Sequence, residues 1–288
     1  MHETLKIKID FAKERRRPAE IFQAMSSYIE AYQALGQVIA TSVGATDDFE
    51  LRLENVETGS IASLLKSVPG KVRTWVEDAV FDAGVKLAGE LSEIDSTSTE
   101  EDVDLLAAKL ETHLSQFDFG QTVDPMIDRK ALAVALSKLS EANKRLLPEE
   151  SATATLTEAH CVTPINTHWR FNANPKDMFL GTKESHIGVD KLYVRAPVNI
   201  GKGAWAMLSV STGSRYNANI SDLGWLEGYQ DGLIKPIGPK DVMEAEVAYE
   251  IYTPPAGKGK PFISSAKIKR VIDIHRDVGL QHEPRPLL

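Results

Sequence analysis

Three histidines and the single cysteine are the residues that most readily suggest chemistry. His160, Cys161, His168 and His186 lie within a window of 27 residues. Imidazole and thiolate are good zinc ligands, so His160, His168 and His186 form a candidate metal site for a metal-assisted hydrolase. A nucleophile pair of Cys161 with a histidine is an alternative. The spacing matches no zinc pattern, so scattered loop or core residues are the competing interpretation.

A second candidate set is basic and lies towards the C-terminus. Small β-barrels bind single-stranded nucleic acid by stacking bases on aromatic rings beside a basic groove. Residues 151–288 carry 16 Lys and Arg against 14 Asp and Glu, a net charge of only +2. The candidate nucleic-acid contacts are Arg215, Tyr216, Lys258, Lys260, Lys267, Lys269 and Arg270.

Charge and composition restrict the remaining function classes. Residues 1–150 carry 17 Lys and Arg against 27 Asp and Glu, so this half repels nucleic acid unless its basic residues cluster. One cysteine excludes a disulfide framework and fits a reducing cytoplasm. Neither a signal peptide nor a membrane-length apolar run is present, so we expect a soluble cytoplasmic protein without a membrane partner. No cofactor-binding motif is found, and we expect no cofactor.

The first 150 residues predict an α+β domain, a small sheet with helices on one face. Apolar residues alternate with polar ones over residues 5–11 and 49–54, which predicts two strands. The turn residues Thr58–Ser60 then lead into a returning strand, Ile61–Leu65, so the second strand belongs to a β-hairpin.

Helical spacing of apolar residues predicts helices over residues 18–39, 72–91 and further segments up to 146. A capping-box spacing runs from Ser98 to Glu101, and the pair Asp124–Pro125 suits another helix start. The many Leu and Val residues of segment 72–147 suggest self-association. The basic run Arg15–Arg17 is interpreted as a solvated helix entrance, or as a surface that pairs with acidic residues 95–104 of a neighbouring subunit.

A domain boundary is predicted at Pro148–Ser151, which gives domains 1–150 and 151–288. Beyond it helical periodicity disappears, and short strands alternate with turn residues, which predicts a small antiparallel β-barrel. The chain from Gln281 onward is expected to be a loose tail. The predicted strands are Ala152–Leu156, Lys191–Val198, Trp205–Val210, Tyr216–Ile220, Val242–Tyr252 and Phe262–Ile274.

The segment Asn217–Lys235 is expected to organise this second domain. After a strand end, Asp222 can cap a short helix whose Leu223, Trp225 and Leu226 are large and apolar. We expect this helix to plug the barrel.

These features resemble a group of uncharacterised bacterial proteins with an N-terminal α/β domain and a C-terminal five-stranded β-barrel. The resemblance is carried by Trp205, Ile220–Asp222, Trp225–Leu226, Gly232–Ile234 and Ile268–Val271, and by the hairpin around Gly59–Ser60. It implies an architecture and an association with bacterial defence or mobile elements, without a mechanism.

The function we expect is that of a non-catalytic binding or scaffolding protein, which acts through protein contacts in a bacterial or phage cytoplasm. The reason is that a sizeable chain shows ordinary core patterning and no converging catalytic set. Nucleic-acid binding by the barrel and metal-assisted hydrolysis are the two alternatives.

Overall fold

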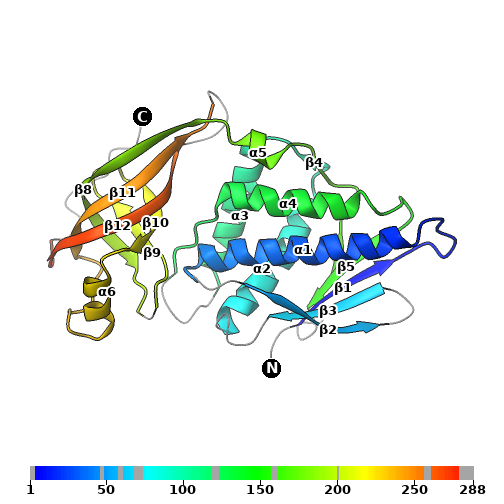
Figure 1. The fold of residues 1–288 in the computed structure, drawn as a ribbon, viewed down its shortest axis with the longest axis horizontal. Helices are drawn as coiled ribbons and strands as arrows, with labels where there is room; N and C mark the ends of the chain where they lie inside the picture. Colours follow the sequence, from blue (N-terminus) through cyan, green and yellow to red (C-terminus); the bar gives the residue numbers. More distant parts are fainter. Residues whose placement is uncertain are drawn as a thin grey trace. The chain divides into compact units, whose positions relative to one another are not determined.

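A computed structural model describes residues 4–45, 49–57, 61–67, 74–117, 123–156, 161–199, 201–255 and 261–278. The fold is mixed α+β, as predicted, and divides into two compact units (Figure 1). The first unit comprises Met1–Ser42, Asp47–Phe117 and Ile127–Phe179; the second comprises Val43–Thr46, Asp118–Met126 and Leu180–Leu288.

The first unit contains a five-stranded sheet with the order β2-β3-β1-β5-β6. Its strands are β1 (Leu5–Asp10), β2 (Leu51–Glu57), β3 (Ile61–Ser67), β5 (Ser151–Leu156) and β6 (Cys161–Ile165). All neighbours pair antiparallel. The predicted first strand and the β2–β3 pairing are confirmed, although the turn at 58–60 lies outside the described residues. Leu5, Ile7 and Ile9 are buried on one face because side chains alternate along a strand.

Four long helices of the described residues belong to this unit: α1 (Ala19–Ser42), α2 (Thr74–Ser92), α3 (Glu100–Ser115) and α4 (Arg129–Asn143). The predicted helix from residue 18 is confirmed, since α1 buries Ile21, Met25 and Tyr28 at helical spacing. The Tyr28 hydroxyl donates to Asn143 Oδ1 over 2.7 Å and joins α1 to α4.

Two predicted helix starts are wrong by a few residues. The capping box of α3 is formed by Thr99 and Asp102. The N-cap of α4 is Asp128, whose carboxylate accepts from the backbone N–H of Ala131 over 2.9 Å. In both places several polar residues stand close together, and only the path of the chain decides which of them caps the helix.

The predicted boundary at residue 150 falls inside the first unit. β5 pairs with β1 along its length, from Leu5↔Leu156 to Asp10↔Ser151, and β6 pairs with β5. A short parallel pair of β4 (Ser96–Thr97) and β7 (Arg170–Phe171) and the helix α5 (Pro175–Met178) complete the unit. β5 and β6 therefore belong to the first sheet, in which β1 pairs with β3 on one edge and with β5 on the other.

In the second unit, five strands form a closed barrel with the order β10-β12-β11-β8-β9. They are β8 (Thr182–Ala196), β9 (Trp205–Ser209), β10 (Arg215–Ile220), β11 (Val242–Thr253) and β12 (Phe262–His275). Four of the five pairings are antiparallel, but β10 and β12 pair parallel, so the predicted purely antiparallel barrel is wrong in this respect.

Helix α6 (Leu223–Gln230) packs against the barrel core, as the plug was predicted to do. Asp222 caps it, because its Oδ1 accepts from the backbone N–H of Trp225 over 3.3 Å. Leu226 and Tyr229 are buried, whereas Leu223 is 45% exposed and contributes less than expected. The predicted loose tail from residue 281 lies outside the described residues.

Among the helices of the described segments, none has the length and apolar character that crossing a bilayer requires.

Candidate functional site

The predicted metal ligands are distributed over both units. His160 lies outside the described residues. His168 is exposed in the first unit, where its backbone N–H donates to Asn166 Oδ1 over 3.1 Å. His186 lies on β8 of the second unit and stacks on Tyr249, with 4.8 Å between the ring centroids. Within the described ranges, no group of three or more His, Cys, Asp or Glu side chains could hold a metal ion.

Tyr216 cannot act as a base-stacking residue in this fold, because its side chain lies in the barrel core. It is 1% exposed, and its hydroxyl has no hydrogen-bond partner within the described part of the chain. Burial raises the pKa of this hydroxyl, and the negative charge of Asp190 raises it further. The prediction that Tyr216 contacts nucleic acid is therefore wrong.

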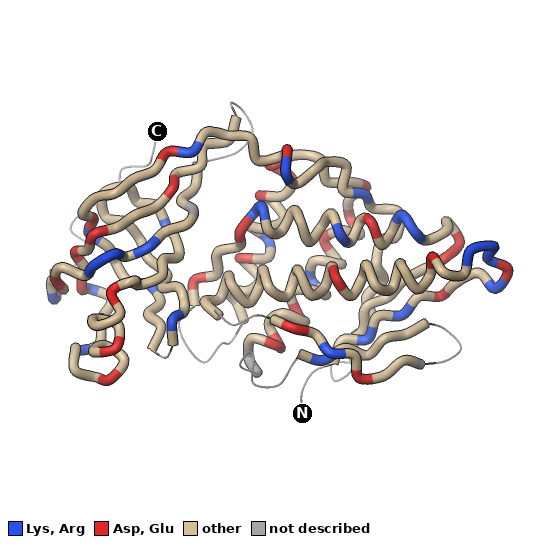
Figure 2. The backbone as a smooth tube through the Cα atoms, viewed as in Figure 1, with Lys and Arg blue, Asp and Glu red and all other residues tan. Residues whose placement is uncertain are grey.

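Two arginines of the predicted nucleic-acid surface are paired with carboxylates. Arg215 Nη1 lies 3.1 Å from Asp124 Oδ1, and Arg270 Nη2 lies 2.7 Å from Glu246 Oε1. Acidic and basic residues intermingle over the barrel (Figure 2). Such pairing reduces the positive potential that phosphate binding requires. Of the other predicted contacts, Lys267 and Lys269 are exposed on β12, and Lys258 and Lys260 lie outside the described residues.

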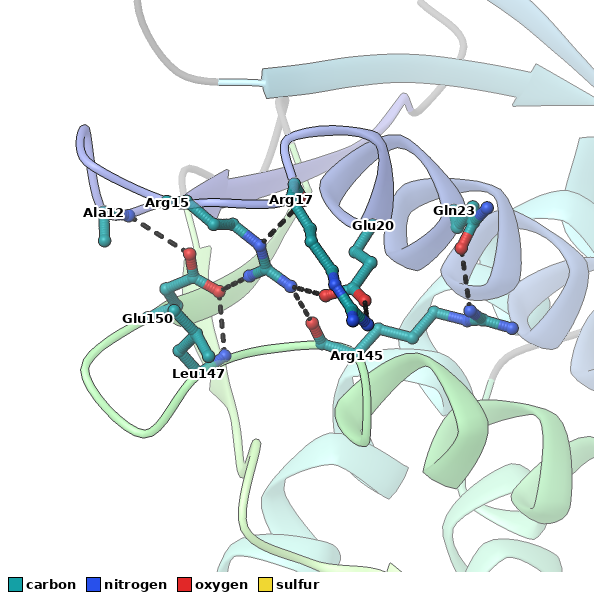
Figure 3. Close-up of polar contacts among 8 residues, drawn as sticks. All are labelled: Ala12, Arg15, Arg17, Glu20, Gln23, Arg145, Leu147 and Glu150. Atoms are coloured by element: carbon teal, nitrogen blue, oxygen red, sulfur yellow. Dashed lines mark hydrogen bonds and ion pairs between the residues drawn. The ribbon is translucent and has the colours of Figure 1, made fainter.

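A buried polar network surrounds Arg15, between β1 and α1 (Figure 3). The Arg15 side chain is 4% exposed and pairs with the fully buried Glu150 carboxylate. That carboxylate also accepts backbone N–H groups of Leu147 over 2.8 Å and Ala12 over 3.2 Å. The guanidinium donates further to the Glu20 carboxylate and to the backbone carbonyls of Arg17 and Arg145.

The environment keeps both members of this pair charged. Burial raises the pKa of Glu150, but the N–H groups of Leu147 and Ala12 and the Arg15 guanidinium outweigh it and leave that pKa below its usual value. Burial lowers the pKa of Arg15, but its carboxylate partners leave it raised overall. The first arginine of the basic run is therefore part of the fold rather than a solvated residue.

We expect the Glu150 carboxylate to contribute to stability in a pH-dependent way. Its pKa is lower in the folded chain than the ordinary value of 4.5, so its contribution is present above about pH 5 and is lost as the pH falls through the folded-state pKa. The free energies of unfolding of the wild type and of Glu150→Gln should therefore converge between about pH 7 and pH 3. Urea titrations at several pH values measure this difference, and a constant difference would contradict the assignment.

An open pocket of about 330 Å³ lies beside the network. Its charged lining residues are mixed, with Arg15, Arg16 and Arg17 against Glu14, Glu20 and Glu149. This balance favours neither an anion nor a cation, so the pocket gives no indication of a ligand.

A narrow cavity of about 20 Å³ lies between α1, α2 and α4. It is lined mainly by apolar side chains, among them Leu87, Leu136 and Trp169. The Trp169 indole N–H has no hydrogen-bond partner in the described ranges. The space holds about one water molecule, which is too little for an organic ligand.

The first half of β8 is the most exposed stretch of the second unit's sheet. β8 pairs with β11 from Thr182 to Tyr193, whereas β9 pairs with β8 only over Leu192–Ala196. In the part of the chain that the structure describes, no strand pairs with the other edge of Thr182–Val189. Side chains on both faces of Thr182–Ile187 are exposed. We call the segment Thr182–Val189 the β8 edge.

The orientation of the backbone groups on this edge follows from one hydrogen bond. The Lys191 carbonyl accepts from the Val210 N–H over 2.8 Å, so Lys191 points its backbone groups away from β11. The register between β8 and β11 has no shift, and backbone direction alternates along a strand. The residues whose N–H and C=O groups face the open edge are therefore Lys183, Ser185, Ile187 and Val189.

Two apolar side chains lie on this stretch. Ile187 is 69% exposed and Val189 is 56% exposed. They lie on the outer face of the barrel, because Leu192, with the opposite parity, is buried in its core. An open edge with exposed β-branched residues is a template on which another strand can pair.

The sequence prediction missed the β8 edge, since it placed the start of this strand at Lys191. Residues 182–186 are polar and show no apolar alternation. They are extended because β11 pairs with them. The spacing of the β-branched residues Ile187 and Val189 was the one local signal that the strand begins earlier.

Comparison of the chain with protein-family models, curated proteins and solved structures gave no match. The resemblance to bacterial barrel proteins therefore stays a prediction.

Proposed function

We propose that this protein is a non-catalytic binding protein that takes up an extended segment of a partner protein at the β8 edge. The observation that supports this is the row of outward backbone groups beside the exposed Ile187 and Val189. An added strand would satisfy these backbone groups and cover the two apolar side chains.

The chemistry of the edge suits a polypeptide. The backbone groups alternate between donors and acceptors, and a second backbone in β conformation offers the complementary series. Lys183 and Glu184 carry opposite charges, so the edge has no net preference for a polyanion. The paired arginines Arg215 and Arg270 likewise weaken the case for nucleic acid.

A proline at Ser185 tests the proposal. Its N–H faces the open edge, so Ser185→Pro should remove one donor without breaking the ladder to β11. We expect extended peptides selected from a displayed random library against the wild-type chain to bind Ser185→Pro about 10-fold more weakly. Titration of a fluorescent peptide measures the change.

Ser185→Ala is the matched control, because it loses the hydroxyl but keeps the N–H. It should bind the peptides as the wild type does, and circular dichroism should show both variants folded. Equal peptide affinities for the proline and alanine variants would exclude strand addition at this edge.

A further inference from the structure

We infer that the segment taken up at the β8 edge is the β8 edge of a second copy of this chain. The two strands run antiparallel about a two-fold axis at Ser185. This inference rests on the proposed function, because it names the partner of the same edge.

The alternation of backbone direction restricts how two such edges can meet. Residues whose backbone groups face the edge must lie opposite each other, and these are the odd-numbered residues from Lys183 to Val189. A two-fold axis at Ser185 meets this condition. It pairs the segment Lys183–Ile187 of one copy with the same segment of the other, so that Lys183 lies opposite the partner's Ile187.

Charge complementarity selects this axis. It places Glu184 opposite the partner's His186, and symmetry repeats the pair, so each carboxylate acceptor meets an imidazole donor. Such a pair does not exchange backbone hydrogen bonds, and its Cα atoms lie about 4.5 Å apart. The His186 ring is already held on this face by its stacking on Tyr249, with 4.8 Å between the centroids.

The outer face of the pairing is also compatible. The Lys183 ammonium is held on this face by Glu250 Oε2, 3.1 Å away, and its aliphatic part would lie against the partner's exposed Ile187. This contact is again repeated by symmetry, so both Ile187 side chains become covered.

Neighbouring axes are less favourable. An axis at Glu184 sets the two Glu184 carboxylates opposite each other, and like charges directly opposite are destabilising. One at His186 pairs the two His186 rings and leaves Glu184 opposite Gly188. An axis at Ile187 places Lys183 opposite the partner's Lys191, whose carbonyl is already bonded to Val210.

Cysteine cross-linking tests the axis. In a Cys161→Ser background, Ser185→Cys places one thiol opposite its own copy, about 5.5 Å away between Cα atoms, a separation that a disulfide spans. We expect mild oxidation to give a covalent dimer. Ile187→Cys is the control, because the two positions 187 would lie about 13 Å apart along the strands. Cross-linking of Ile187→Cys with none at 185 would overturn this axis.

Exchanging the residues at positions 184 and 186 tests the pairing of Glu184 with the partner's His186. Sedimentation of the wild type should show reversible dimers, and His186→Glu, which sets carboxylates opposite each other, should weaken them about 10-fold. The double variant Glu184→His/His186→Glu should restore the affinity.

A wild type that stays monomeric up to about 200 μM, with no cross-link at 185, would overturn the inference. If Ser185→Pro still lost peptide binding and Ser185→Ala did not, the proposed function would stand and only the second copy would be excluded.

Discussion

Replacing Arg15 by alanine should lower the free energy of unfolding by about 3–5 kcal/mol, one of the largest effects expected in this chain. The Glu150 side chain is fully buried, and Arg15 is the cation that neutralises it. Without the guanidinium, the carboxylate stays buried beside the N–H groups of Leu147 and Ala12 and loses its charge partner. Urea unfolding of the full chain followed by circular dichroism measures the loss.

The effect should depend on the pair rather than on charge in general. Arg16 follows directly in the sequence but is exposed, so Arg16→Ala should change the stability by less than about 0.5 kcal/mol. The double variant Arg15→Met/Glu150→Met should recover much of the loss, because it leaves no uncompensated charge. If Arg15→Ala and Arg16→Ala cost the same, Arg15 would not be the buried partner of Glu150.

Local patterns were sufficient to predict the central elements of the first unit. Leu5, Ile7 and Ile9 alternate with polar residues, and this period of two survives in the fold because one face of β1 is buried. The apolar periodicity of α1 likewise predicted the helix and much of its buried face, since Met25 and Tyr32 are buried, but Phe22 of the predicted stripe is 64% exposed. In both elements one face meets the core, so the period of the apolar residues along the sequence indicates that one face is buried.

The division into units could not be predicted from composition alone. The change in composition after residue 150 is real, but β5 completes the sheet of the first unit through its pairing with β1. Strand pairing joins residues far apart in the sequence, here Leu5 with Leu156, and no local signal specifies it. The parallel pairing of β10 with β12 is a second feature of this kind.

The same limit applies to the candidate site. Tyr216 alternates with polar neighbours, but the sequence does not say which face of β10 points inward, and the fold buries this ring. The β8 edge depends on the difference in length between β8 and β9, and hence on where β9 begins to pair. An open edge is a property of the sheet, which becomes visible only when every strand has been placed.

Replacing Trp205 by alanine should cost about 3–5 kcal/mol and loosen the second unit. The Trp205 side chain is 0% exposed and packs edge-on against Tyr229 and Trp225 of α6, with ring centroids 5.0 Å and 5.8 Å away. Its loss leaves a cavity between the barrel and this helix. Hydrogen-exchange mass spectrometry should show faster exchange in peptides from β9 to β12 and little change in α1 or β1.

Two variants separate the roles of the ring and of the helix. The Trp205 indole N–H has no hydrogen-bond partner in the described ranges, so Trp205→Phe should lose only packing volume and cost about 1–2 kcal/mol. Leu223→Ala, on the same helix but half-exposed, should cost less than about 1 kcal/mol. If Trp205→Phe were as costly as Trp205→Ala, a polar partner of the indole would have to exist. If Leu223→Ala were the costlier variant, the helix would be held by its outer side and not by the aromatic cluster.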